Sequence, residues 1–181
     1  NGYEPHYSGA ITSENQVQVY EPIMVDSNDI QTYTLLRAAD YIKDNRILPR
    51  GFDAKAVPDE VAVKGLAASD QDFVAGSDLV TYVIDLPTGP AGVKVSAELN
   101  YQTLAFGFLR DLKRDAGNAT VKRFLDMYDN SAVRAETIAT AVRLAGVIDG
   151  GGTGTTPPPD SGTGGDTGSG QWIPGPRPWW R

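Results

Sequence analysis

The sequence predicts a mainly β fold, an antiparallel β-sandwich of the immunoglobulin or fibronectin type with one or two short inserted helices and an extended C-terminal tail. Three patterns lead to this prediction. Apolar and polar residues alternate over 93–101 and over 138–144, as in strands that have one buried and one solvated face. Helical spacing is confined to a stretch near 105–130. Only glycine, threonine, serine, proline and aspartate occupy residues 150–170.

The extended segments follow one another along the first hundred residues. Residues 17–23 predict an edge strand or a strand with a break, because their proline cannot donate to a ladder, and residues 26–29 predict a turn. Over 32–45 the apolar spacing fits a helix while the composition fits a strand, so we expect a strand that runs into a short irregular or helical piece. Residues 79–86, rich in β-branched and aromatic side chains, should pair with 93–101 as a hairpin or sandwich corner.

Two helices and a closing strand are expected in the last third of the domain. Residues 106–112 carry leucines at a three-residue step. The apolar residues of 121–128 fall at i, i+3, i+4 and i+7, which predicts a second helix with Asn118 or Thr120 as its cap. The alternation over 138–144 then predicts the strand that closes the sandwich.

The composition divides the chain into three parts: a domain over 1–148, a linker over 149–170 and a tail over 171–181 that holds all three tryptophans. A short segment of this kind does not fold by itself. It is typical of a tethered peptide ligand, extended by its prolines and anchored by its aromatic rings. The residues expected to bind a partner are Trp172, Ile173, Pro174, Arg177, Trp179, Trp180 and Arg181.

The overall charge and the missing cysteines exclude several classes of function. The net charge of −7, with a pI near 4.6, repels phosphate backbones, so we expect no nucleic-acid binding. With no cysteine, the chain cannot form disulfides, zinc ribbons or covalent c-type haem attachments. No apolar run is long enough to span a bilayer, and no signal peptide is recognisable. Because the chain begins at Asn1, we expect a processed product or a fragment.

The chain contains a single histidine, His6. Imidazole can ligate a metal or a haem iron, or act as a general base, so His6 is a candidate for a haem or metal contact. The alternative is a residue of the terminal segment without such a role. The sequence has no G-x-S-x-G elbow, no phosphate loop and no pair of carboxylates placed for glycoside hydrolysis. We therefore expect a non-catalytic protein and not an enzyme.

Two short acidic segments could offer oxygen ligands to a cation. Asp26, Asn28 and Asp29 have a spacing loosely compatible with calcium, although the glycine and the glutamate of an EF-hand loop are missing. A solvated turn is the alternative, and the composition favours it. A second acidic loop, for which a solvated turn is again favoured, contains Asp70, Asp72 and Asp78.

Several segments resemble a region of large bacterial multihaem c-type cytochromes. They are EPHY (4–7), VQVYE (17–21), YTLLRAADYIKDNRILPRGFD (33–53), GSD (76–78) and AELNYQ (97–102). The resemblance spans roughly Tyr3 to Leu144 and implies a haem-free module that follows CxxCH-bearing segments at the carboxyl end. Since no CxxCH is present here, it implies that haem is carried by a partner or by a missing upstream segment. The tail after Gly150 lies outside the resemblance.

Together these observations predict a secreted or periplasmic, haem-free structural module of a multihaem cytochrome assembly. We expect it to pack against haem-bearing protein, or against copies of itself, and to use its tail to bind a neighbour. A subunit of an extracellular fibre or adhesive surface layer is the second hypothesis. A carbohydrate-binding sandwich, which would expose aromatic side chains on one sheet face, is the third.

Overall fold

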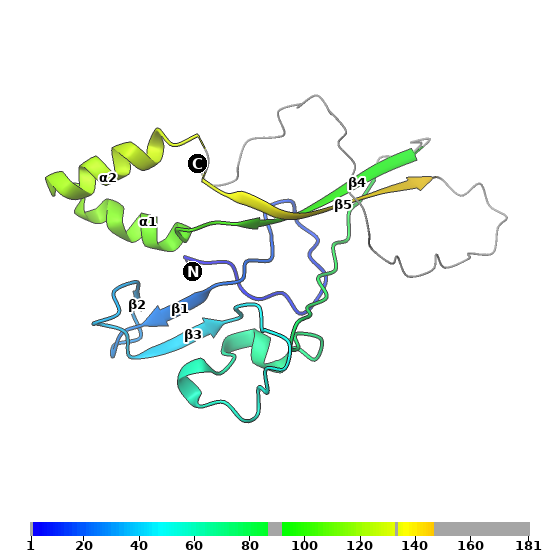
Figure 1. Cartoon of the computed structure of the whole chain (residues 1–181), viewed down its shortest axis with the longest axis horizontal. Coiled ribbons are helices and arrows are strands. Elements are labelled where there is room, and N and C mark those ends of the chain that lie inside the picture. The colour runs from blue at the N-terminus through cyan, green and yellow to red at the C-terminus, as the bar shows by residue number, and fades with distance from the viewer. Residues whose placement is uncertain (1, 87–91, 133, 147–181) are drawn as a thin grey trace.

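The computed structural model describes residues 2–86, 92–132 and 134–146. For residues 145 and 146 it describes the backbone alone. Figure 1 shows a small sheet on one side, a long two-stranded ribbon crossing beside it, and two helices at one end of that ribbon. The strands are β1 (Pro22–Val25), β2 (Gln31–Thr32), β3 (Asp40–Asp44), β4 (Gly92–Tyr101) and β5 (Glu136–Gly146). The α-helices are α1 (Phe106–Leu112) and α2 (Ala119–Asp129), and the 3-10 helices are η1 (Asp59–Val61), η2 (Gly65–Ser69) and η3 (Lys113–Asp115).

The first sheet is antiparallel and has the strand order β2-β1-β3. Its proline stands at the first position of β1, where the missing N–H does least harm to a ladder. Asp26 closes the turn to β2, because its Oδ1 accepts the backbone N–H groups of Asn28 at 2.8 Å and Ile30 at 3.0 Å. The alternation of β1 buries Ile23 and Val25 on one face.

The core lies beside this sheet and continues into the loops that follow it. Leu48, Ala67 and Phe73 form its central cluster, and Tyr20 and other partly buried side chains pack against them. Helix η2 packs on β3 and begins at Gly65, whose φ of +71° belongs to the left-handed region. The sheet and η2 therefore enclose a small hydrophobic core that is built almost entirely from the first half of the chain.

Strands β4 and β5 form a separate antiparallel ribbon, paired from Gly92 with Gly146 to Tyr101 with Glu136. The chain between them folds into α1, η3 and α2. Asn118 caps α2, since its side chain accepts the backbone N–H of Thr120 at 2.9 Å. Both predicted helices and both predicted strands of this region are confirmed.

Helix α1 approaches the first sheet through a glycine. Gly107 is buried, and a Cβ at this position would collide with the hydroxyl group of Tyr33, which follows β2. Leu109 is buried on the same helix. A small residue is therefore required where α1 meets the segment after β2.

The predicted fold class is confirmed in its coarse form, as a β-rich antiparallel fold with few helices, whereas sandwich packing is not confirmed. The predicted pairing of 79–86 with 93–101 is wrong: β4 pairs with β5, and the earlier segment makes only an isolated parallel bridge between Tyr82 and Ile11. Over 32–45 we expected a strand followed by an irregular or helical piece, but the structure has the opposite order, with turns first and β3 after them. The predicted linker and tail lie outside the described residues. No helix in the described part of the chain could cross a membrane.

Candidate functional site

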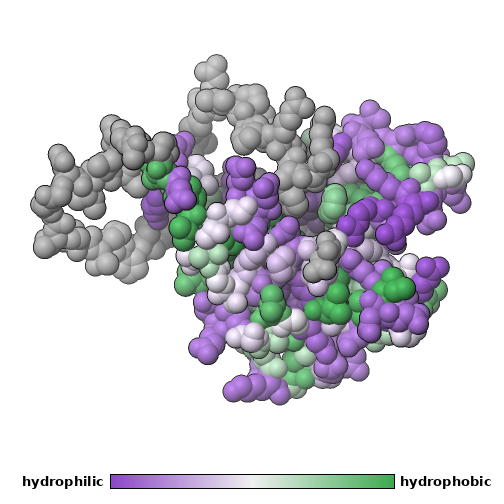
Figure 2. Space-filling view, turned by 180° about the vertical axis from the view of Figure 1, so that it is seen from behind, coloured by the Kyte–Doolittle hydropathy of each residue, from purple (hydrophilic) through white to green (hydrophobic). Residues whose placement is uncertain are grey.

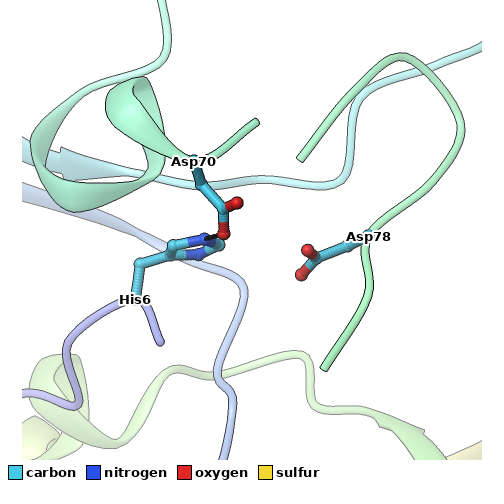
Figure 3. A group of neighbouring side chains, drawn as sticks. All are labelled: His6, Asp70 and Asp78. Atoms are coloured by element: carbon cyan, nitrogen blue, oxygen red, sulfur yellow. Dashed lines mark hydrogen bonds and ion pairs between the residues drawn. The ribbon is translucent and has the colours of Figure 1, made fainter. Parts of the chain in front are cut away.

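His6 lies at the centre of a buried polar cluster. Its side chain has no solvent-exposed surface, and its Nε2 stands 2.8 Å from Oδ2 of Asp70, 64 residues later in the chain. On the other side of the ring, Nδ1 lies 2.7 Å from Nε2 of Gln18 and 3.1 Å from Nδ2 of Asn45. These four residues, the His6 network, tie the N-terminal segment to three distant parts of the chain. Figure 3 shows the contact between His6 and Asp70.

The backbone fixes which nitrogen of His6 carries the proton. Oδ1 of Asn45 accepts the Glu21 N–H at 2.9 Å, and Nδ2 donates to the Val19 carbonyl at 2.9 Å. Oε1 of Gln18 accepts the backbone N–H of Tyr7 at 2.9 Å. Both amides therefore present N–H groups to Nδ1 of His6, which must accept. The imidazole is thus the Nε2–H tautomer and donates to Asp70.

A second carboxylate, Asp78, points toward the same space from the far end of the loop (Figure 3). Its Oδ2 accepts the Tyr20 hydroxyl at 2.6 Å, and its Oδ1 is buried with no hydrogen-bond partner among the described residues. Burial, followed by the hydrogen bond to Asp78, raises the pKa of the Tyr20 phenol well above its ordinary value, so Tyr20 remains a donor. Phe73 packs edge-on against the His6 ring at 5.1 Å and completes the apolar side of the cluster.

This geometry fits neither a general base nor a transition-metal ligand. A histidine that binds a metal through one nitrogen almost always donates the other N–H to an acceptor. If Nε2 of His6 bound a metal, the proton on Nδ1 would face the N–H groups of Gln18 and Asn45, which the backbone holds in place. The absence of exposed imidazole surface also gives a partner's haem no access to His6. This placement therefore disfavours the haem or metal contact predicted for His6.

Lys43 and Glu21 form a second buried polar pair next to the network. Nζ of Lys43 donates to the carbonyl of Glu4 at 2.7 Å and to that of Val19 at 2.9 Å, and it lies 3.6 Å from Oε1 of Glu21. Burial raises the pKa of Glu21 and lowers the pKa of Lys43, although each partner partly offsets the shift of the other. The pair fastens the N-terminal segment to β3.

We expect the Glu21→Gln variant to change the pH dependence of stability. Because the folded-state pKa of Glu21 is raised, the folded chain keeps this proton after the unfolded chain has lost it. The resulting stability is fully present below the unfolded pKa and is lost as the pH rises through the folded pKa. Urea unfolding from acid to neutral pH should show wild type losing stability relative to Glu21→Gln. If the stabilities of wild type and Glu21→Gln changed in parallel with pH, the raised pKa of Glu21 would be contradicted.

The structure places the predicted calcium residues in the β1–β2 turn. The two backbone hydrogen bonds from Asn28 and Ile30 lower the pKa of the carboxyl group of Asp26, a partly exposed residue. Asp29 adopts a φ of 59°, as asparagine and aspartate do in turns. The hydrogen bonding of the turn therefore accounts for these residues without a cation.

The β4–β5 ribbon exposes apolar side chains from both of its strands, among them Val95, Leu99, Val142 and Leu144. Residues opposite one another in an antiparallel pair share a face, so Leu99 lies beside Ala139 and Ala97 beside Ala141. Every residue of β4 except Val93 is exposed, which contradicts the predicted buried face. The end of the ribbon away from the helices lies at the left of Figure 2, and hydrophobic side chains are at the surface there. The apolar residues of this face are Val93, Val95, Ala97, Leu99, Ala139 and Ala141, and Arg143 stands opposite Val95 on the same face. The other face carries the exposed side chains of Val142 and Leu144.

Of the residues predicted to form sites, the structure brings His6 together with Asp70 and Asp78, which the sequence had favoured as parts of a solvated turn. Sequence analysis did not identify Gln18 and Asn45. The predicted partner-binding residues of 171–181 lie outside the described part. A scan against protein-family models, a search of curated proteins and a search of solved structures each found no match to this chain.

Proposed function

We propose that the chain is a haem-free structural and interaction module of an extracytoplasmic multihaem cytochrome assembly. The observation that carries the interaction part is the exposed apolar face of the β4–β5 ribbon, where Val95 is 44% and Leu99 is 38% exposed. A two-stranded ribbon is at best marginally stable in water without further strands or a packed face. The ribbon therefore fits a surface that a partner covers.

The apolar face of the ribbon is too small to hold a partner by itself. The ten residues of β4 give a face about 33 Å long and about 10 Å wide, and thus about 330 Å² per molecule. Two copies packed face to face would bury about 660 Å², below the roughly 1,000 Å² of a stable interface. A partner that also adds a strand to a free ribbon edge would gain backbone hydrogen bonds as well as apolar contact.

A multihaem cytochrome is the proposed partner because four of the resembling segments lie in the first half of the chain and the fifth, 97–102, overlaps β4. The chain has no cysteine for covalent haem, so the haem groups would reside on the partner. The carbohydrate-binding hypothesis gains no support from the ribbon, because Tyr101 is the single aromatic residue on its two strands.

Placing a charge on the apolar face should disrupt the assembly without unfolding the chain. Ala97→Glu introduces a carboxylate at an exposed position opposite Ala141, so we expect a stability change within about 0.5 kcal/mol, but at least a tenfold loss of partner affinity, or about 1.4 kcal/mol. Ser96→Glu is the matched control, since it adds the same charge one residue earlier, on the opposite face. The measurement is Soret absorbance per mole of tagged full chain in the assembly isolated from source cells.

The same experiment separates the hypotheses. Equal loss in both variants would contradict docking through this face. An assembly of tight partners that contains no haem protein would exclude the cytochrome proposal, and a haem-free polymer of this chain alone would support the fibre hypothesis instead.

A further inference from the structure

Asp70 and Asp78 bring two carboxylates to one side of the His6 ring without a neighbouring lysine or arginine. The potential ligand atoms of His6, Asp70 and Asp78 all lie within 4.8 Å of one another. The side chain of Asp70 is only 5% exposed, and neither carboxylate has an ion pair with Lys or Arg among the described residues. Burying like charges together is unfavourable unless a positive charge joins them.

Each carboxylate is already oriented by a neutral donor. The Nε2–H of His6 holds Oδ2 of Asp70, and the Tyr20 hydroxyl holds Oδ2 of Asp78. This leaves Oδ1 of Asp78 buried and unpartnered within the described chain. Carboxylates that bind a metal are commonly fixed by such outer hydrogen bonds. His6 and Tyr20 therefore occupy the positions of orienting residues, while the carboxylate oxygens remain available as ligands.

We propose that Asp70 and Asp78 bind a hard divalent cation, for which calcium is the best match. Calcium accepts oxygen ligands at about 2.3–2.6 Å in flexible geometry, so two ligands of one ion can stand up to about 5 Å apart. The ligand oxygens of Asp70 and Asp78 lie within 4.8 Å of each other, which satisfies that limit. Magnesium demands near-ideal octahedral geometry at about 2.0–2.1 Å, and zinc favours nitrogen and sulfur ligands, which the His6 tautomer withholds.

The affinity should be modest. Two carboxylates supply only part of the six to eight oxygens that calcium binds, so water completes the shell from the partly exposed side of Asp78. We expect a dissociation constant on the order of 10⁻⁴–10⁻³ M, as in extracellular calcium modules. Bound cation would link the two ends of the 70–78 loop, and it would do so independently of any partner on the ribbon.

The test uses the full chain, first stripped with a chelator and then titrated with calcium chloride. We expect saturable calcium binding that raises the melting temperature by about 3–8 °C. Terbium, as a luminescent stand-in for calcium, should show emission sensitised by Tyr20, and Tyr20→Phe should reduce that emission.

The Asp78→Asn variant gives the decisive comparison. It keeps an acceptor for Tyr20 but removes a charge, so its chelated form should melt no lower than wild type while its calcium response is lost. Asp70→Asn should lose the response as well, and Asp26→Asn, in the β1–β2 turn, should retain it. The proposal is overturned if wild type gives no saturable calcium or terbium signal, or if Asp78→Asn responds as wild type does.

Discussion

Replacing Gly65 with alanine should destabilise the domain by about 2–5 kcal/mol. The φ of +71° at this position costs an L residue about 1–2 kcal/mol. In addition, a Cβ would stand 2.6 Å from the backbone carbonyl oxygen of Ile42, which cannot move aside without shifting β3. Overpacking of this kind typically costs a further 1–3 kcal/mol, roughly. Urea or thermal unfolding measures the loss.

Gly51 provides the matched control for this substitution. Its φ is also positive, at +83°, but no atom lies within 4 Å of a Cβ built there. Gly51→Ala should therefore cost only the backbone contribution, about 1–2 kcal/mol. If Gly65→Ala and Gly51→Ala lowered the unfolding free energy equally, the expected clash between a Cβ at residue 65 and the Ile42 carbonyl oxygen would make no contribution.

Removing the imidazole in His6→Ala should cost about 3–5 kcal/mol. The change removes the donor to Oδ2 of Asp70 and the acceptor that Nδ1 offers to the N–H groups of Gln18 and Asn45. Each unsatisfied buried group costs roughly 1–3 kcal/mol, and a charged group costs more. The unfolding free energy from urea titration checks this expectation.

A double-mutant cycle with Asp70→Asn isolates the His6–Asp70 contact from the rest. Because the two side chains touch, the cycle should show a coupling energy of about 1–3 kcal/mol. Nitrogen NMR of the wild-type ring should show the proton on Nε2. A ring protonated on Nδ1, or additive single-variant effects, would contradict the described network.

The elements most accessible to sequence analysis were those governed by local periodicity. The alternation over 93–101 and over 138–144 identified β4 and β5, and the cap at Asn118 identified the start of α2. Pairing is not a local property, since any two alternating segments can form a ladder in principle. Proximity along the chain favoured residues 79–86 as the partner of β4, whereas the structure inserts two helices and pairs β4 with β5.

The candidate site could be predicted only in part for the same reason. His6 was identifiable because imidazole is chemically distinctive. Gln18 and Asn45 carry no local signal, since their role depends on backbone groups at Tyr7, Val19 and Glu21 that fix their orientation. The acidic loop was interpreted from composition alone, and composition does not report that the Asp70 side chain is buried against a residue 64 positions away.

The long sequence separations within the His6 network also constrain how the chain can fold. Residues 3–7 belong to no strand, and their anchors at Asn45 and Asp70 lie 39 and 64 residues after His6. During synthesis this segment leaves the ribosome before the residues that it docks on, and its docking site is complete only after the 70–78 loop has emerged. Contacts between residues so far apart in sequence slow folding, so the N-terminal segment should lock in place last, after the first sheet and η2 have formed.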